Sequence, residues 1–277
     1  DKEIAKRLTA EIERLAALPD DDALIQARLA VARAFAAVAL RSPTAAPLFD
    51  LAARRFEEIG NAEIARMQRN SFGTALGWLG RWEEAAAMLR EIPEAGGRAW
   101  LWTRVTLAWT LAQLGETDEA LTLLDRAVAE GGNDVFLIVE TRLVRARVEI
   151  MRDRAREAAE GVRNALADES LPNAIVARLH AVGWEAAHTF DAELAARHGR
   201  ALEALLEADV ALVEDAVYVR QIAAEARAAS GDHAGARARL AEARALVDAY
   251  AAQIGDATRF LERVRENARV IALADQI

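Results

Sequence analysis

The sequence predicts an all-α protein, and three observations support this prediction. Alanine, which has the highest helix propensity, accounts for 66 of the 277 residues. Helix-breaking residues are few, with 15 glycines and 5 prolines in the whole chain. The third observation is a pattern of small and large apolar residues that recurs along the chain at the length of a helix pair.

The recurring pattern is clearest in two segments, residues 72–92 and 107–127, which match each other at an offset of 35 residues. Their matched positions are Gly80 with Gly115, Ala85 with Ala120, and Leu89 with Leu124. Further copies of the small-large-small pattern stand at Ala158, Val162 and Ala165, at Ala236, Leu240 and Ala243, and more weakly at Ala45, Phe49 and Ala52. The small residue lets a neighbouring helix approach, and the larger residue fills the space beside it. Because one such unit cannot bury its apolar face alone, the units are predicted to stack on one another.

Turn signals between the units divide the chain into about fourteen predicted helices. These signals are glycines, prolines and helix-capping residues, as in SPT at 42–44, EGGND at 130–134, SLPN at 170–173 and SGDH at 230–233. The predicted helices, in chain order, are 3–18, 21–41, 43–59, 61–79, 82–92, 98–114, 117–130, 134–152, 154–167, 172–189, 191–207, 211–229, 233–253 and 256–275.

No segment between these helices has the composition of a flexible linker, so we expect a single superhelical domain over residues 1–277. The expected parts are an N-terminal helix (1–20), the repeats (21–253) and a C-terminal capping helix (254–277). The last helix is expected to act as a cap because its apolar residues, such as Phe260 and Val264, lie outside the repeat register.

The repeats resemble the tetratricopeptide repeat (TPR), a helix-turn-helix unit of about 34 residues. The positions that hold the family's large-small pair, turn glycine, aromatic, small alanine and large apolar residue are Phe72, Gly73, Gly80, Trp82, Ala85 and Leu89. The next unit departs from the pattern at Ala108 and Thr117. The unit over 173–207 is degenerate, because it keeps the spacing but reverses the sizes. The resemblance implies a right-handed α-solenoid whose first helices line a concave groove.

The alanine- and arginine-rich array and its closing segment FLERVRENARVIALA (260–274) are also similar to the C-terminal repeat regions of large bacterial signalling proteins. In such proteins the repeats follow kinase or ATPase modules. This resemblance implies that the chain is the regulatory part of a larger bacterial protein. A first residue of Asp1 in place of methionine agrees with that expectation.

The overall charge argues against two classes of partner. The formal net charge is −9 and the pI is about 5.2. Such a chain lacks the basic surface that neutralises phosphates, so neither nucleic acid nor an anionic membrane is an expected partner. No run of about 18 uninterrupted apolar residues predicts a membrane span. The absence of cysteine excludes disulfides and thiolate metal sites and suits a reducing compartment, so we expect a cytoplasmic protein.

Motifs of known catalytic chemistry are absent from the sequence. It contains no GxSxG, HExxH, Walker loop or GxGxxG motif. The only lysines are Lys2 and Lys6, so the rest of the chain has no P-loop or Schiff-base lysine. The adjacent carboxylates, such as Glu83 and Glu84, lie in terminal turns of predicted helices, where a solvated role is expected. We therefore predict no catalytic residue and no cofactor.

Histidines are the residues that could suggest a metal site. His180, His188 and His198 lie on two adjacent predicted helices with Glu185 and Asp191 nearby. They could form a histidine-carboxylate cluster if the corner folds the second helix onto the first. The preferred interpretation is that they are ordinary, partly exposed histidines of the degenerate unit, and no metal site is predicted.

The tryptophans are the one group of residues whose distribution the repeat pattern alone does not explain. Five of the six lie within 32 residues, at positions 78, 82, 100, 102 and 109. Trp82 occupies a position that packs inside the repeat, whereas Trp102, Val105 and Trp109 form one stripe on a helix because they are spaced by three and four. If the TPR resemblance holds, this stripe faces the concave groove. The predicted groove residues are Met67, Asn70, Thr74, Trp78, Trp102, Val105, Trp109, Leu143 and Arg147. The alternative is that these tryptophans fill the space between successive helices.

The preferred function is that of a non-catalytic interaction, scaffold or sensory domain. It would bind a peptide or a partner domain in its groove, with tryptophans as apolar anchors. A second hypothesis is a small-ligand sensor with a tryptophan-lined pocket. A third is an enzyme with an unfamiliar site in the degenerate unit.

Overall fold

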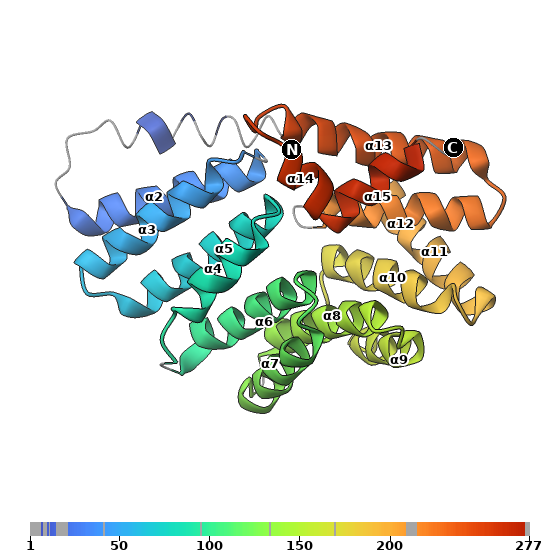
Figure 1. Cartoon of the computed structure of the whole chain (residues 1–277), viewed down its shortest axis with the longest axis horizontal. Coiled ribbons are helices and arrows are strands. Elements are labelled where there is room, and N and C mark those ends of the chain that lie inside the picture. The colour runs from blue at the N-terminus through green and yellow to red at the C-terminus, as the bar shows by residue number, and fades with distance from the viewer. Residues whose placement is uncertain are drawn as a thin grey trace.

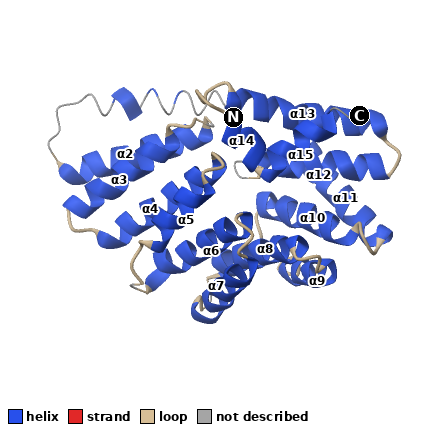
Figure 2. Cartoon of the chain, in the orientation of Figure 1, coloured by secondary structure: helices blue, strands red, loops and turns tan. Residues whose placement is uncertain are grey.

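The computed structural model describes residues 7, 10, 12–14, 22–40, 42–94, 96–132, 134–168, 170–208 and 215–274. Within these residues every regular element is a helix and none is a strand (Figure 2). The predicted all-α fold class is therefore confirmed. None of the described helices combines the length and the apolar character that crossing a bilayer requires.

The helices carry the labels of Figure 1. They are α2 (Ala23–Ala39), α3 (Ala45–Glu58), α4 (Ala62–Trp78), α5 (Trp82–Arg90), α6 (Gly97–Gln113), α7 (Thr117–Glu130), α8 (Val135–Met151), α9 (Ala155–Ala165), α10 (Asn173–Ala187), α11 (Ala192–Glu207), α12 (Ala216–Ala229), α13 (His233–Ala251), α14 (Thr258–Arg263) and α15 (Arg265–Ala274).

Helices α2 to α13 match the predicted ranges to within two residues at each end, with one exception. The start predicted at residue 211 lies outside the described residues, and α12 begins at Ala216. Most of the predicted helix 3–18 also lies outside the described residues.

The single helix predicted for residues 256–275 is wrong, because the structure has two helices there. The backbone is extended at Val264, with φ −83° and ψ 107°, between α14 and α15. The break frees two carbonyl groups from helical hydrogen bonding. The carbonyl of Phe260 accepts from the side chain of Asn267 at 2.9 Å, and that of Arg263 accepts from the indole N–H of Trp82 at 3.0 Å. These contacts satisfy polar groups that a continuous helix would have paired internally.

The repeated apolar positions are buried. Side chains with at most 1% exposure include Ala85, Leu89, Ala120, Leu124, Ala158 and Val162. The turn before α5 also needs its glycine, because Gly80 has φ +70° and a Cβ there would lie 2.4 Å from the carbonyl oxygen of Arg259. The small-large packing pattern read from the sequence is therefore present in the described helices.

The packing of the helices follows their order in the chain. Each helix from α2 to α13 packs against the next, and α4, α6, α8, α10 and α12 also pack against one another in series. Figure 1 shows the successive helices following an arc from α2 to α13. Helices α14 and α15 then pack on α13, and α15 also packs on α12.

The C-terminal helices also reach the N-terminal half of the chain. Besides the Trp82 hydrogen bond, Arg263 pairs with Glu83 at 2.8 Å and Arg259 pairs with Glu84 at 3.2 Å. Figure 1 shows α14 on the side of α13 that faces α5. These contacts join residues about 180 positions apart in sequence.

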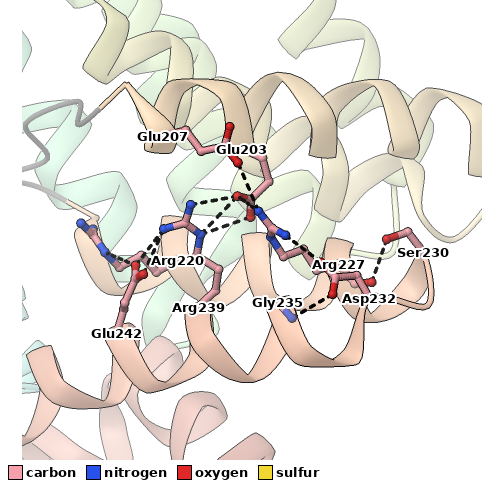
Figure 3. Close-up of polar contacts among 9 residues, drawn as sticks. All are labelled: Glu203, Glu207, Arg220, Arg227, Ser230, Asp232, Gly235, Arg239 and Glu242. Atoms are coloured by element: carbon pink, nitrogen blue, oxygen red, sulfur yellow. Dashed lines mark hydrogen bonds and ion pairs between the residues drawn. The ribbon is translucent and has the colours of Figure 1, made fainter.

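An ion-pair network connects α11, α12 and α13 (Figure 3). Glu203 on α11 accepts hydrogen bonds from Arg227 on α12 at 2.8 Å and from Arg239 on α13 at 3.0 Å. Arg227 also donates to Asp232 at 2.7 Å, and Asp232 caps α13 by accepting from the backbone N–H of Gly235 at 2.9 Å. Burial raises the pKa of Glu203, but the hydrogen bonds from the two arginines outweigh it, so the pKa lies below its usual value.

Candidate functional site

An open cavity of about 560 Å³ lies along the helices that pack in series. We call it the central groove. Its walls come from α4, α6, α8 and α10, with further side chains from α2 and α3 and from Asp215 just before α12. Since the helices in series present corresponding faces to one side, residues of successive units meet around one space.

Eight of the nine predicted groove residues line the central groove. They are Asn70, Thr74, Trp78, Trp102, Val105, Trp109, Leu143 and Arg147. Met67 does not line it, and its side chain is 43% exposed elsewhere on α4. The structure therefore brings together residues that were selected by their repeat register, while their role in binding stays a prediction.

The lining residues differ in how much of their surface is exposed to the groove. Val105 and Leu143 are 3% and 1% exposed, so they belong mainly to the core. Trp102 and Trp109 are half-buried, and they pack against the core cluster of α6 and α8 while also lining the groove. Each of these two tryptophans therefore does both things that the sequence allowed: part of it fills space between helices and part of it lines the groove.

Trp82 lies in the core, as predicted, with 5% exposure. Its ring packs on α4 so closely that a Cβ on Gly77 would lie 2.5 Å from it. Trp100 and Trp184 are buried to a similar extent. The six tryptophans thus divide into three core residues and three that line the groove.

Several lining residues were not predicted from the sequence. Phe35 and Val38 of α2, Ile175 and Arg178 of α10, and Asp215 all face the central groove. The residues of α2 and α10 occupy first helices of units with weak or degenerate patterns, so extending the register through those units would have found them. Asp215 lies in a connection before α12, where no helical register applies.

A chain of buried charges forms one end of the groove. Arg178 donates to Glu140 at 2.7 and 2.8 Å and to Asp215 at 2.8 Å. Asp215 also accepts from Arg147 at 3.3 Å, and Arg147 pairs with Glu266 of α15. Asp215 holds a left-handed backbone conformation, with φ 52°, and its side chain binds the two arginines and does not cap α12.

These charges hold one another ionised. Burial raises the pKa of Asp215, but the positive charges of Arg178 and Arg147 outweigh it, and the pKa lies below its usual value. Burial lowers the pKa of Arg147, and the charges of Asp215 and Glu266 more than reverse this effect. The guanidinium of Arg147 also stacks on Trp109, 3.9 Å from the ring centroid, and on Tyr218 at 4.4 Å. These groups therefore stay charged and paired with one another at neutral pH.

The three candidate histidines do not all meet. His180 and His198 lie with their Nδ1 atoms 2.9 Å apart, as the folded corner between α10 and α11 would require. His188 instead stacks on Trp184, with ring centroids 4.7 Å apart. Burial and the neighbouring His180 lower the pKa of His198 to about 4, so the pair is neutral at pH 7. No group of three or more metal-ligating side chains is close enough to hold an ion within the described part of the chain.

The carboxylates at the start of α5 have partners that the sequence did not predict. Glu83 and Glu84 were expected to be solvated, and both remain exposed, but they bind Arg263 and Arg259 of α14. The hydrogen bond from Arg263 lowers the pKa of Glu83 to about 2. No local pattern predicts these pairs because their partners are far away in sequence.

Comparison with known proteins adds no family to this description. No protein-family model matches the chain, and no curated protein matches it.

Proposed function

We propose that the chain is a right-handed α-solenoid of TPR-like repeats that binds an extended or helical peptide segment of a partner protein in the central groove. The series packing of α4, α6, α8, α10 and α12 supports the solenoid arrangement. So does the burial of the repeated small and large positions. In this proposal residues 1–277 form one superhelical domain, part of a larger bacterial regulatory protein in the cytoplasm.

The observation that carries the proposed function is the convergence of eight register-selected residues on one cavity. Three of them are tryptophans that are half-buried, so their rings are held in place while part of their surface stays accessible. Rigid aromatic surface of this kind supplies contact area with little loss of side-chain entropy, and tryptophan is enriched at binding hot spots.

The polar residues of the groove favour a peptide as the ligand. Asn70, Ser71, Thr74 and Thr106 lie among the aromatic residues and carry both donors and acceptors. Such groups match the amides of a peptide, while Trp102 and Trp109 provide places for its apolar side chains. The four charged lining residues, Glu140, Arg147, Arg178 and Asp215, are bound to one another, which supports a non-catalytic role.

The test begins with selection of peptides from a random display library on the whole chain. The best selected peptide is then titrated into wild type, Trp102→Ala and Met67→Ala. Trp102→Ala is expected to weaken binding by about 2 kcal/mol, or about thirtyfold in Kd, because it removes a central anchor. Met67→Ala is the matched control, since Met67 was chosen by the same register but lies outside the groove.

Two results would contradict the proposal. One is that no peptide is enriched above an unrelated helical protein of similar charge. The other is that Trp102→Ala, with its folding verified by circular dichroism, binds the selected peptide as tightly as wild type.

A further inference from the structure

A second, smaller cavity of about 140 Å³ lies where the C-terminal helices meet the N-terminal half. We call it the closure pocket. One wall comes from α4, α5 and α6 through Trp78, Trp82 and Trp109. The facing wall comes from α12, α13 and α14 through Tyr218, Tyr250 and Phe260. Six aromatic rings from two distant parts of the chain therefore surround one small space.

The closure pocket is held by defined contacts on either side. The Trp82 indole donates to the carbonyl of Arg263, and Arg147 joins Trp109 to Tyr218 through its stacked guanidinium. Tyr250 stacks on Phe260 with ring centroids 5.0 Å apart. The aromatic walls are thus fixed in place before any ligand arrives, which favours binding because little ordering is required.

The size and the walls indicate the kind of molecule that fits. An apolar protein cavity of about 150 Å³ holds a benzene-sized ring. Aromatic walls favour an aromatic guest through edge-to-face and offset-stacked contacts.

The polar edge of the closure pocket adds a second requirement. The charged residues that line it are both acids, Asp215 and Glu266, while their partner Arg147 is not part of the lining. An ionised carboxylate can accept hydrogen bonds but cannot donate them. A ligand that enters should therefore carry a donor, which an anionic carboxylate does not have.

We propose that the closure pocket is a binding site for a single-ring aromatic molecule bearing a hydrogen-bond donor, such as a phenol. This site adjoins the peptide groove of the proposed function. It shares Val38, Trp78, Trp109 and Asp215 with the groove, but Trp102 lines only the groove and Val264 lines only the closure pocket. Because the ligand contacts both halves, its binding stabilises the contact between α14 and α5.

The test uses phenol as the probe and benzoate as its anionic counterpart of similar size. Titration calorimetry and ligand-observed NMR measure binding to the whole chain, and thermal unfolding measures stabilisation. Phenol is expected to bind saturably with a Kd of about 1 mM or tighter and to raise Tm with concentration. Benzoate is expected to bind at least tenfold more weakly, a difference of about 1.4 kcal/mol, because it has no donor for these carboxylates.

Substitutions in the lining of the closure pocket test whether phenol binds there. Leu246 of α13 and Val264 both line the closure pocket. Val264→Phe and Leu246→Phe each add a ring to this lining and are expected to weaken phenol binding at least tenfold. Trp102→Ala is the matched control and should leave the phenol Kd unchanged. This control also separates the two proposals, because the peptide test depends on Trp102 and the phenol test does not.

Three results would overturn the assignment. The first is that phenol does not bind saturably, and the second is that benzoate binds as tightly as phenol. The third is that Trp102→Ala loses phenol binding while a folded Val264→Phe or Leu246→Phe variant retains it. The first two need only the wild-type chain, so they decide the matter even where a filling variant fails to fold.

Discussion

At the scale of single residues, burial separates tryptophans that belong to the same sequence cluster. Trp82 is 5% exposed and donates a hydrogen bond across the molecule, whereas Trp102 is half-buried at the edge of an open groove. A buried ring contributes transfer free energy over its whole surface and leaves a cavity when it is removed. A ring with one accessible face contributes less to stability and more to contact with a partner.

The first prediction follows from this difference. Trp82→Ala is expected to lower the free energy of unfolding by roughly 3–5 kcal/mol through the residual cavity, in addition to the lost hydrogen bond to Arg263. Trp102→Ala should lower it by roughly 1–2 kcal/mol, since only part of its surface is buried. Urea unfolding of the two variants measures both values. Equal and large losses at both positions would show that Trp102 is a core residue and that the groove is closed in solution.

A second prediction concerns acid stability and the His180–His198 pair. In the folded chain the pKa of His198 is lowered to about 4 from an ordinary value of 6.5. Between these two values the unfolded chain binds a proton that the folded chain does not. The contribution of His198 to stability is therefore complete above pH 6.5 and is lost as the pH falls toward 4. The free energy of unfolding of wild type should decline more steeply over this window than that of His198→Gln, and parallel pH profiles from urea titrations would count against a buried neutral pair.

At the scale of helices, the repeated packing pattern depends on alanines at positions where a larger side chain would not fit. Ala120 on α7 and Ala158 on α9 are both fully buried where neighbouring helices approach. Four residues after these alanines stand Leu124 and Val162, which are also buried. Such interfaces resist added volume, because close-packed side chains cannot move apart without losing their own contacts.

We therefore expect Ala120→Leu and Ala158→Leu each to destabilise the chain by roughly 1–3 kcal/mol through overpacking. The matched control is Ala129→Leu, which adds the same side chain at an exposed position of α7 and should change stability by less than about 0.5 kcal/mol. Chemical denaturation provides the comparison. If both buried substitutions fall within about 0.5 kcal/mol of wild type, the assigned register is wrong.

The ion-pair network of α11 to α13 allows a further prediction at this scale. Glu203 accepts from Arg227 and Arg239, and its side chain is 13% exposed, whereas Glu207 on the same helix is 66% exposed and lies 3.5 Å from Arg227. Glu203→Gln leaves two guanidinium groups without their shared carboxylate and should cost roughly 1–3 kcal/mol. Glu207→Gln should cost less than about 0.5 kcal/mol, because exposed pairs contribute little. Thermal unfolding of both variants tests this order, and equal losses would mean that the network adds no stability beyond that of an exposed pair.

The helices themselves could be predicted from sequence because the signals are local. Turn residues and apolar spacing place the ends of α4 to α9 within two residues, since hydrogen bonding in a helix involves residues four apart. The break at Val264 could not be predicted, because nothing in residues 256–275 forbids a continuous helix. The carbonyl of Arg263 at this break accepts a hydrogen bond from Trp82, which lies on another helix 181 positions earlier and so outside any local pattern.

The same distinction applies to the candidate site. Eight groove residues were selected because repeats place equivalent residues on one side. Asp215 could not be found in this way, although it binds Arg147 and Arg178, because it precedes a helix in a non-repeating connection. The closure pocket also could not be predicted from the sequence pattern, because its two walls meet only when the C-terminal helices contact α5.

At the scale of the whole molecule, the contact between α14 and the turn before α5 joins the C-terminal helices to the N-terminal half of the chain. Gly80 lies at this contact, because a Cβ there would be 2.4 Å from the carbonyl oxygen of Arg259. Gly115 occupies the equivalent turn of the next unit, also in the left-handed region with φ +86°, but nothing lies within 4 Å of the Cβ that it lacks. The two glycines therefore share the same conformational requirement and differ only in the presence of α14.

This pair of glycines gives the last prediction. Gly115→Ala should destabilise the chain by roughly 1–2 kcal/mol, the cost of placing an alanine in the left-handed conformation. Gly80→Ala incurs the same cost and also drives a methyl group against the Arg259 carbonyl, so it should destabilise by about 1 kcal/mol more. Only Gly80→Ala should accelerate amide hydrogen exchange in residues 258–263, because only there must α14 move away. Equal stability losses, together with unchanged exchange in α14, would show that the C-terminal helices do not press against the N-terminal half in solution.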